Sequence, residues 1–262
     1  MTPIRVLVTG ARGRMGIETM RAVLQQEDMA LVAAVDPSGA GQAVSQLADV
    51  PTDLSIAGDL AQQLAEAKPE VLVDFTVPEA VMGNLRAAFK ARVACVVGTT
   101  GLKPPDLEEI ARLCEQEQTP AFVAPNFAIG AVLMMQFAAQ AARHFARAEI
   151  IELHHDKKKD APSGTALRTA ELMRQAEGSL LAGDEAKQQA PSRGLGAGKI
   201  RLHSVRLPGL VAHQEVILGG VGQTLAIRHD SINRESFMPG VLLAIRKVRS
   251  LRGLVVGLEN IL

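Results

Sequence analysis

Through its first half, the chain alternates short, continuously apolar runs with longer amphipathic stretches. The apolar runs predict strands over Ile4–Val8, Leu31–Val35, Val71–Phe75, Cys95–Val97 and Ala121–Ala124. The stretches between them carry apolar residues at helical spacing and predict helices over Arg14–Gln26, Asp59–Ala67, Pro78–Lys90 and Pro104–Gln118. Strands that are apolar throughout and separated by helices are typical of a parallel sheet covered on both faces. The sequence therefore predicts an α/β fold for this half.

The pattern changes after residue 127, where strands begin to follow one another. Helices are predicted over Gly130–Ala146 and Ala161–Ala176, a loop over Gly178–Gly198, and strands over Glu149–His155, Ile200–Arg206, Gln214–Leu218 and Thr224–His229. A helix beginning at Pro239 and a short apolar run complete the chain. We expect a second α+β domain with a mixed or antiparallel sheet over residues 127–237. Residues 1–126 form the first domain, and residues 238–262 return to it.

Composition excludes several classes of protein. Among 262 residues, 28 Lys and Arg balance 28 Asp and Glu, which argues against a partner bound through bulk charge, such as nucleic acid. Two cysteines form neither a disulfide framework nor a metal-ligand pattern, so no metal is expected. The three-residue apolar run Val6–Val8 is too short for a signal peptide, and no run approaches the length of a membrane span. We expect a soluble cytoplasmic protein with no membrane partner.

A glycine-rich turn follows the first predicted strand and opens the first helix. It reads Gly10-Ala11-Arg12-Gly13-Arg14-Met15-Gly16. Glycines let a backbone approach a pyrophosphate, and the helix N-terminus offers free N–H groups. Asp36 ends the next strand, 20 residues after Gly16, where its carboxylate accepts hydrogen bonds from a ribose. The context predicts a Rossmann-like dinucleotide site, and a purely structural turn is the alternative.

The residues after Asp36 bear on the choice of cofactor. A 2′-phosphate usually requires an adjacent arginine, but Pro37-Ser38-Gly39 stands here. This favours NADH over NADPH, while Arg12 or Arg14 leaves use of both open.

Turns of small and polar residues also follow the third, fourth and fifth strands. They are Asp74–Pro78, Gly98–Gly101 and Pro125–Phe127. Ligands of parallel sheets bind at the carboxyl ends of the strands. Each turn alone has an ordinary structural explanation, but together they favour a cofactor groove.

The stretch Glu152–Ala166 holds the densest cluster of reactive side chains. It contains His154, His155, three lysines at 157–159, and the turn Ser163-Gly164-Thr165 before a helix. Adjacent histidines lack the spacing of a helical zinc pair. Lysine, a capped helix N-terminus and a histidine that titrates near neutrality favour a site for an anionic substrate. A solvated basic loop is the alternative.

On this stretch, the chain resembles the 4-hydroxy-tetrahydrodipicolinate reductase family. The motif is HHxxKxDAPSGTA from His154 to Ala166. The glycine turn, Asp74–Thr76, Gly98–Gly101, Asn126-Phe127 and Ser231–Phe237 agree with the family in order and spacing. The resemblance spans essentially the whole chain.

The resemblance implies an enzyme that reduces a small cyclic dicarboxylate imine with NADH or NADPH in the diaminopimelate–lysine pathway. It implies catalytic His154 and Lys158, with substrate bound by His155, Lys158, Ser163, Gly164 and Thr165. The matching cofactor positions are Gly10, Ala11, Arg12, Gly13, Arg14, Met15, Asp36, Gly98, Thr99, Thr100, Ala124, Pro125, Asn126 and Phe127. Members of the family are usually homotetramers joined through sheets of the second domain.

Some assignments stay open at this point. Lys157 and Lys159 flank Lys158, so the choice among the three rests on spacing alone. Four cationic residues of the second-domain strands line either the site, an interface or an exposed face: His203, Arg206, His213 and Arg228. Another nicotinamide-dependent dehydrogenase of a small anion and a non-catalytic dinucleotide sensor are the alternative functions. The sensor has no need of the histidine–lysine cluster.

Overall fold

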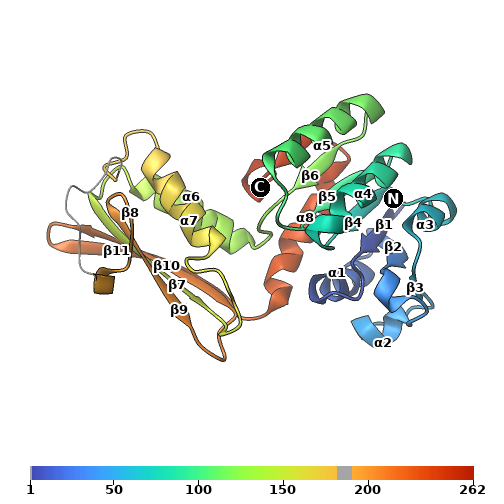
Figure 1. Cartoon of the computed structure of the whole chain (residues 1–262), viewed down its shortest axis with the longest axis horizontal. Helices are drawn as coiled ribbons and strands as arrows, with labels where there is room; N and C mark the ends of the chain where they lie inside the picture. Colours follow the sequence, from blue (N-terminus) through green and yellow to red (C-terminus); the bar gives the residue numbers. More distant parts are fainter. Residues whose placement is uncertain (1, 182–190) are drawn as a thin grey trace. The chain divides into compact units, whose positions relative to one another are not determined.

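The protein was analysed as a computed structural model that describes residues 2–181 and 191–262 (Figure 1). It divides into two compact units. Unit 1 comprises Met1–Phe127 and Phe237–Leu262, and unit 2 comprises Ala128–Ser236. Each unit has its own sheet and helices.

Unit 1 is built on a parallel sheet. Its strands, over the residues described, are β1 (Ile4–Thr9), β2 (Met29–Val35), β3 (Ile56–Ala57), β4 (Val71–Asp74), β5 (Ala94–Val97), β6 (Ala121–Val123) and β12 (Leu254–Val256). They lie in the order β12-β6-β5-β4-β1-β2-β3, and all neighbouring pairs are parallel. The predicted Rossmann-like sheet is thereby confirmed.

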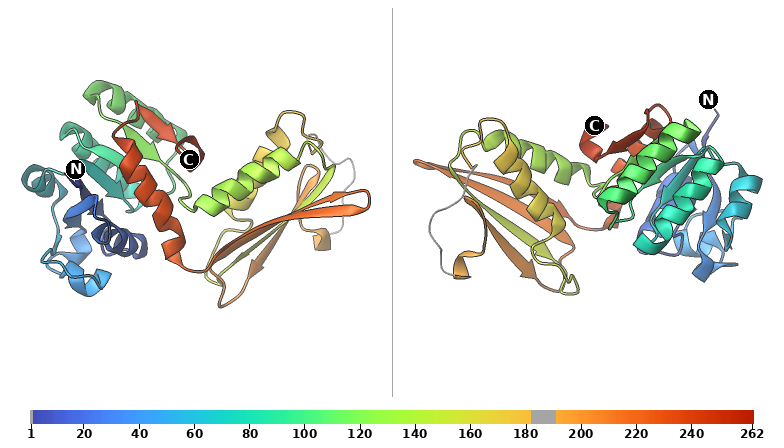
Figure 2. Two further views of the ribbon diagram at one scale, coloured as in Figure 1. Left: turned by 180° about the vertical axis from the view of Figure 1, so that it is seen from behind. Right: turned by 45° about the horizontal axis from the view of Figure 1, so that its top comes forward.

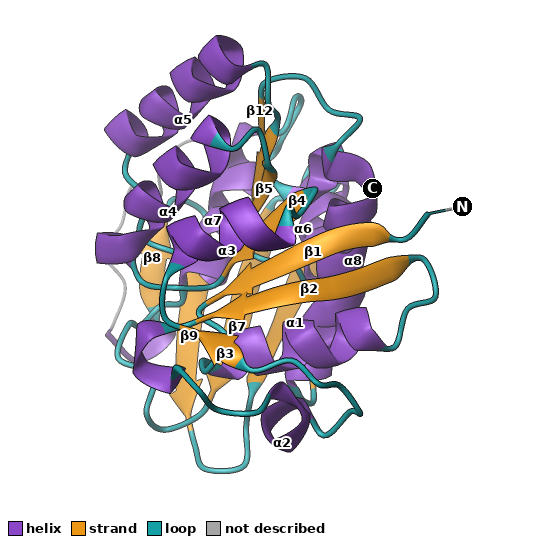
Figure 3. Cartoon of the chain, turned by 90° about the vertical axis from the view of Figure 1, so that its right-hand side faces the viewer, coloured by secondary structure: helices purple, strands orange, loops and turns teal. Residues whose placement is uncertain are grey.

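Helices cover both faces of this sheet (Figure 3). They are α1 (Arg14–Leu24), α2 (Val44–Ala48), α3 (Leu60–Ala67), α4 (Pro78–Lys90), α5 (Pro104–Glu117) and α8 (Met238–Val248). The contacts place α3, α4 and α5 in one layer and α1 with α8 in the other. Because side chains of both strand faces are buried, the strands are apolar throughout: Leu7, Leu72 and Cys95 pack under α4 beside Phe89.

The C-terminal segment completes unit 1. β12 pairs in parallel with β6, with Val255 opposite Phe122. Helix α8 contacts β4, β5 and β6 and buries Val241, Ile245 and Val248. The first sheet is therefore assembled from two segments that are far apart in the sequence.

Unit 2 is a mixed sheet with helices on one face (Figure 2). Its described elements are α6 (Ile129–Ala141), β7 (Arg147–His154), α7 (Gly164–Gln175), β8 (Leu195–Ala197), β9 (Ile200–Arg206), β10 (Ala212–Gly220) and β11 (Gln223–Ser231). The strand order is β11-β10-β7-β9-β8, with β7 and β9 parallel and the other pairs antiparallel. The predicted mixed sheet is thus confirmed.

Several element boundaries differ from the predictions. Helix α7 begins at Gly164 rather than Ala161, because Pro162 disfavours a helical residue before it and Ser163 caps the helix. Helix α6 ends at Ala141, five residues earlier than expected. The predicted loop Gly178–Gly198 contains β8, and its residues 182–190 lie outside the described part of the chain.

Short elements complete the description. Single turns of 3-10 helix cover Pro37–Gly39, Pro191–Arg193, Arg234–Phe237 and Leu258–Asn260. Among the described elements, the shortest α-helix, α2, and the shortest strand, β3, are too brief to show a period and were not predicted. Within the described residues, every helix is too short or too polar to cross a membrane.

Candidate functional site

The glycine turn after β1 has room for backbone only. Gly10 has φ +72°, and a Cβ built on it would lie 2.3 Å from the carbonyl oxygen of Phe75. A Cβ on Gly16 would lie 2.1 Å from the carbonyl oxygen of Gly10. Since no side chain fits either position, these glycines hold β1, the turn and α1 in close contact.

The N–H groups of this turn divide into two sets. The first set is already bonded within the protein. The Ala11 N–H donates to the Val35 carbonyl, the Arg12 N–H to the Asp36 carboxylate and the Gly13 N–H to the Gly10 carbonyl. Helix α1 then starts at Arg14 without a side-chain cap, since its N-cap residue is Gly13. The first turn of α1 is therefore the part of the motif that offers donors to an anion.

Asp36 directly follows β2, and both of its carboxylate oxygens accept hydrogen bonds. Its Oδ2 accepts from the Arg12 N–H at 3.1 Å, and its Oδ1 accepts from the N–H and hydroxyl of Ser38 at 3.0 and 2.7 Å. Burial opposes its charge, but these bonds outweigh it and lower the pKa of the carboxyl. Asp36 is thus a carboxylate fixed beside the glycine turn.

A pocket of about 850 Å³ opens at the carboxyl ends of β1, β2 and β4. It is lined by three predicted cofactor residues, Gly10, Gly13 and Asp36. Its remaining lining includes Thr76, from the predicted strand-end turn Asp74–Pro78, and polar side chains that sequence reasoning did not assign to the site: Ser38, Asp59 and Asn84. Asn84 comes from α4, so no strand-end pattern marks it. Parallel sheets bind nucleotides at the strand ends where this pocket opens.

Asp74 joins the strand-end turns of unit 1. Its fully buried carboxylate accepts from the hydroxyls of Thr9, Thr76 and Thr99 at 2.9, 2.7 and 2.6 Å. The Thr76 N–H and the Asn84 amide add bonds of 3.0 and 2.8 Å. The hydroxyl of Thr99 therefore donates to the Asp74 carboxylate, and its N–H donates to the Asp74 carbonyl at 3.2 Å, so both donors of this predicted cofactor residue hold the turn in place.

The last predicted cofactor segments follow β5 and β6. A Cβ on Gly98 would lie 2.0 Å from the ring of Phe75, and that ring packs edge-on against Phe127 at 5.7 Å. Ala124 is buried, while Thr100 and Pro125 are exposed. Asn126 is partly buried. The aromatic pair thus supports the turns after β5 and β6. Phe75 also lines the 850 Å³ pocket, whereas Gly98–Thr100 and Ala124–Phe127 do not.

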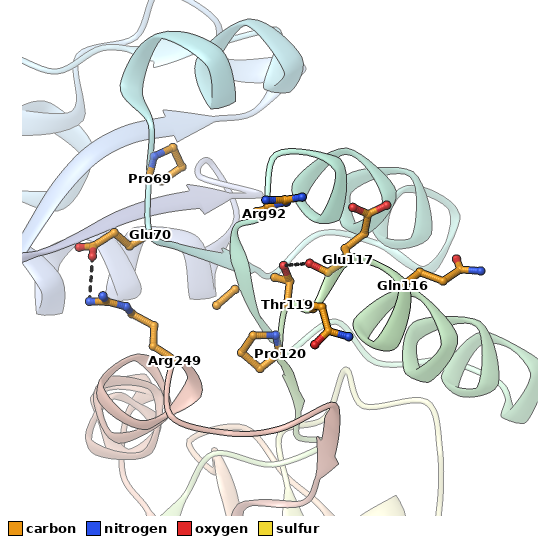
Figure 4. A pocket seen from close by; sticks show the side chains of 10 residues that line it. Pro69, Glu70, Arg92, Gln116, Glu117, Thr119, Pro120 and Arg249 are labelled. Carbon is orange, nitrogen blue, oxygen red and sulfur yellow. Dashed lines mark hydrogen bonds and ion pairs between the residues drawn. The ribbon is translucent and has the colours of Figure 1, made fainter.

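A second hollow, of about 510 Å³, lies at the opposite ends of the strands (Figure 4). Its lining includes residues that precede β4, β5 and β6, and an ion pair of 2.8 Å joins Glu70 to Arg249 there. Parallel sheets bind nucleotides at the carboxyl ends of their strands. The hollow of Figure 4 therefore is not the dinucleotide site.

In unit 2, one lysine of the basic run differs from its neighbours. Lys158 is partly buried, and its Nζ contacts both carboxylate oxygens of Asp160 at 2.8 and 2.9 Å. Lys157 and Lys159 are exposed. A hydrogen bond from the Lys158 N–H to the carbonyl of His155 forms the turn that holds it. The structure thus distinguishes Lys158 by position as well as by spacing.

His154 ends β7 beside a buried carboxylate. Its Nδ1 lies 2.5 Å from Oε2 of Glu152, whose side chain is 0% exposed. Burial lowers the pKa of His154, as do the charges of Lys158 and Arg206, and they outweigh the opposing effect of Glu152. His154 is therefore mainly neutral at neutral pH.

The Ser163–Thr165 turn opens α7. Ser163 accepts from the N–H of Ala166 at 3.2 Å and thereby caps the helix. Gly164 is exposed, and Thr165 and His155 are partly exposed. One loop thus joins β7 to α7. His154 lies where it leaves β7, His155 and Lys158 lie within it, and the Ser163–Thr165 turn lies where it enters α7.

We expect Gly10→Ala to lower the free energy of unfolding by about 1–3 kcal/mol, because a side chain at positive φ is strained. Dinucleotide affinity should fall with it, since the added methyl group meets the Phe75 backbone. Urea unfolding and cofactor titration measure the two effects. Gly219→Ala is the control, because its Cβ would meet no atom within 4 Å. Equal stability of Gly10→Ala and the control would contradict the expectation.

Both halves of the chain match models of one protein family. Residues 4–127 match the model "Dihydrodipicolinate reductase, N-terminus", and residues 130–262 match "Dihydrodipicolinate reductase, C-terminus". The chain is 55% identical over 261 residues to the 4-hydroxy-tetrahydrodipicolinate reductase of Moorella thermoacetica, covering 99% of this chain and 98% of that one. It is 50% identical over 266 residues to that of Desulfitobacterium hafniense, with full coverage of both.

Solved structures agree with the sequence relatives. A dipicolinate-bound dihydrodipicolinate reductase from Paenisporosarcina sp. TG-14 has a TM-score of 0.85 and 42% identity, with full coverage of both chains. An amine dehydrogenase from Mycobacterium smegmatis has a TM-score of 0.65 at 13% identity, covering 96% of this chain and 94% of that one. The latter shares the fold alone.

Proposed function

This chain belongs to the dihydrodipicolinate reductase family, and from that premise we propose which of its residues carry out the reaction. It is an NAD(P)H-dependent oxidoreductase that reduces 4-hydroxy-tetrahydrodipicolinate in the diaminopimelate–lysine pathway. In this reaction a hydride joins the ring, and the hydroxyl leaves with a proton as water.

Unit 1 is proposed to hold the cofactor. The uncapped start of α1, at Arg14 and Met15, accepts the pyrophosphate, and Asp36 accepts from the ribose hydroxyls. The turns Gly98–Thr100 and Ala124–Phe127 receive the other half of the dinucleotide. Support comes from the glycine turn, where a Cβ on Gly16 would overlap the Gly10 backbone. When bound, the reduced nicotinamide supplies the hydride.

Unit 2 is proposed to hold the dicarboxylate. The cap of α7 leaves N–H groups at Gly164 and Thr165 for one carboxylate, and His155 with Lys158 provides positive or donor groups for the rest. The single observation that carries the proposal is that Lys158 is partly buried and held by Asp160, whereas Lys157 and Lys159 are exposed. Ser163 contributes by fixing the helix start.

His154 and Lys158 are proposed to supply the proton. Hydride addition makes the substrate more negative, and an ammonium group nearby stabilises that charge and can donate a proton. In the structure Asp160 holds this ammonium group. We infer that a substrate carboxylate takes over from Asp160, since both present the same pair of oxygens to Nζ.

The test is the rate of cofactor oxidation at 340 nm, with substrate made freshly from pyruvate and aspartate semialdehyde. Turnover that disappears in His154→Gln, with cofactor affinity unchanged, supports the proposed residues. Full turnover in that variant overturns the role given to His154. Cofactor binding without turnover of this substrate overturns the substrate assignment.

We further propose a preference for NADH. Asp36 is ionised and already bound by Ser38 and Arg12, so the 2′-phosphate of NADPH meets a like charge. We expect a KM for NADPH about tenfold higher than for NADH, which corresponds to about 1.4 kcal/mol. Asp36→Ser should narrow this ratio, whereas Asp49→Asn, an exposed control, should not. A ratio near one in the unmodified enzyme would refute the preference.

We also propose a homotetramer joined through the sheet of unit 2. β11 forms one edge of that sheet. Its first four residues, 223–226, are exposed, and Leu225 among them is 39% exposed. An exposed strand edge readily joins another chain. Sedimentation equilibrium should give the mass of four chains, and a monomer would contradict the proposal.

A further inference from the structure

Glu152 is a buried carboxylate in β7 with no part in the roles assigned above. Arg206 donates to it with both terminal nitrogens, Nη1 to Oε2 at 2.8 Å and Nη2 to Oε1 at 2.7 Å. The N–H of Ser163 donates to Oε1 at 3.1 Å, and Ser204 lies opposite Glu152 in β9. Arg206 and Ser163 thus hold the carboxylate in place, and the carboxylate in turn contacts His154.

The sheet register accounts for this cluster. Glu152 and His154 are two residues apart in β7, so their side chains leave the same face of the sheet. In the parallel neighbour β9, Ser204 lies opposite Glu152 and Arg206 opposite His154. The arrangement is therefore fixed by two central strands rather than by a mobile loop.

We propose that Glu152, held by Arg206, is a positioning residue that fixes the hydrogen of His154 on Nδ1 and leaves Nε2 as the nitrogen that exchanges the proton. This inference rests on the proposed role of His154. It adds to that role the identity of the reacting nitrogen and the groups that determine it.

The argument is one of hydrogen-bonding capacity. Burial opposes the charge of Glu152, but the hydrogen bonds with Arg206 and His154 and the nearby Ser204 hydroxyl outweigh it and lower the pKa of this carboxyl, so it is ionised and only accepts. The ring nitrogen 2.5 Å away therefore carries a hydrogen. A proton taken up at Nε2 then makes a cation that Glu152 stabilises, while Arg206 keeps the proton from moving onto the carboxylate.

The same pair also anchors the loop that carries the lysine. Arg206 Nη2 donates to the carbonyl of Asp160 at 2.7 Å, and Glu152 receives the N–H of Ser163. Asp160 holds Lys158, and Ser163 caps α7. One buried ion pair therefore fixes both proton-transfer candidates relative to each other.

The first test needs no variant that risks unfolding. Enzyme labelled with ¹⁵N-histidine is studied by long-range ¹H–¹⁵N correlation, and the spectrum of His154→Gln identifies the His154 signals. We expect a neutral ring protonated on Nδ1 near pH 7.5. A ring protonated mainly on Nε2 would overturn the proposal, whatever the activity of His154→Gln.

The second test compares two glutamates of β7. Glu149 also pairs with a histidine and an arginine, His203 at 2.8 Å and Arg193, but it belongs to the opposite face of the sheet. We expect Glu152→Gln to lower kcat by about 10–100-fold, part of what general acid–base catalysis contributes. The His154 inflection of the pH–rate profile should move to lower pH, because the charge that favours the protonated ring is gone. Glu149→Gln should change neither kcat nor the His154 inflection of the pH–rate profile.

The outcomes separate the inference from the proposed function. Glu152→Asp keeps the charge and should restore the inflection at least in part, which a merely structural role does not predict. Unaltered inflection and ring tautomer in a folded Glu152→Gln would overturn the inference. An active His154→Gln would instead overturn the proposed function, while the ring signals of the unmodified enzyme still decide the tautomer.

Discussion

Lys158→Ala is expected to lower kcat by about 10²–10⁴-fold, the range that a positioned general acid contributes. The ammonium group of Lys158 is the one in its run that is partly buried and held in a fixed place. KM should rise as well, because a cation that meets the substrate carboxylate is lost. Steady-state kinetics at saturating NADH measure both parameters.

Lys157 and Lys159 provide matched controls in the same loop. Each is exposed, so Lys157→Ala and Lys159→Ala remove an equal charge from the loop without removing the held ammonium group. We expect kcat within about twofold of the parent for both, in line with surface substitutions that affect energies by less than about 0.5 kcal/mol. A comparable loss in all three variants would show that bulk charge, and not Lys158, is responsible.

Asp74→Ala is expected to cost about 3–5 kcal/mol of the free energy of unfolding of unit 1. Removing this fully buried carboxylate takes the shorter acceptor from the hydroxyls of Thr9 and Thr99 and from the amide of Asn84. Only the longer contacts of these donors, at 3.3–3.5 Å, remain. Each buried donor without a partner costs about 1–3 kcal/mol, and partial rearrangement reduces the sum. Cofactor affinity should fall too, because the turn at Thr99 loses its anchor.

Urea unfolding and cofactor titration test this expectation. Asp28→Ala is the control, because Asp28 forms an exposed ion pair with Arg246 at 2.8 Å, and such pairs contribute less than about 1 kcal/mol. If Asp74→Ala were as mild as Asp28→Ala, water would have to replace the carboxylate, and Asp74 would not organise the strand ends.

Much of the fold of unit 1 follows from local sequence patterns. Its central strands are buried on both faces, so they appear as apolar runs, and α4 was predicted with both of its ends because Pro78 marks the first turn. The glycine turn was equally clear, since a positive φ at Gly10 and the close approach at Gly16 admit no other residue. Local physics suffices where a position has only one acceptable residue type.

The polar networks could not be predicted in this way. Asp74 gathers donors from β1, α4 and two turns, and Glu152 meets Arg206 only when β7 and β9 pair in one register. Thr9, Asn84 and Thr99 are 65, 10 and 25 residues from Asp74 in the sequence, and Arg206 is 54 residues from Glu152. No periodicity or spacing rule connects residues whose proximity is created by the sheet itself.

The return of the C-terminal segment to unit 1 affects how the chain is made. A ribosome completes residues 1–127 well before α8 and β12 exist, and at 5–20 residues per second the roughly 110 residues in between take about 5–20 s. During that interval the strip of β4, β5 and β6 that α8 covers has no partner, and the edge of β6 is unpaired. Unit 2 is contiguous and is finished first. The nascent nucleotide domain thus spends seconds as an incomplete sheet, which makes it, rather than the smaller domain, the natural client of chaperones at the ribosome exit.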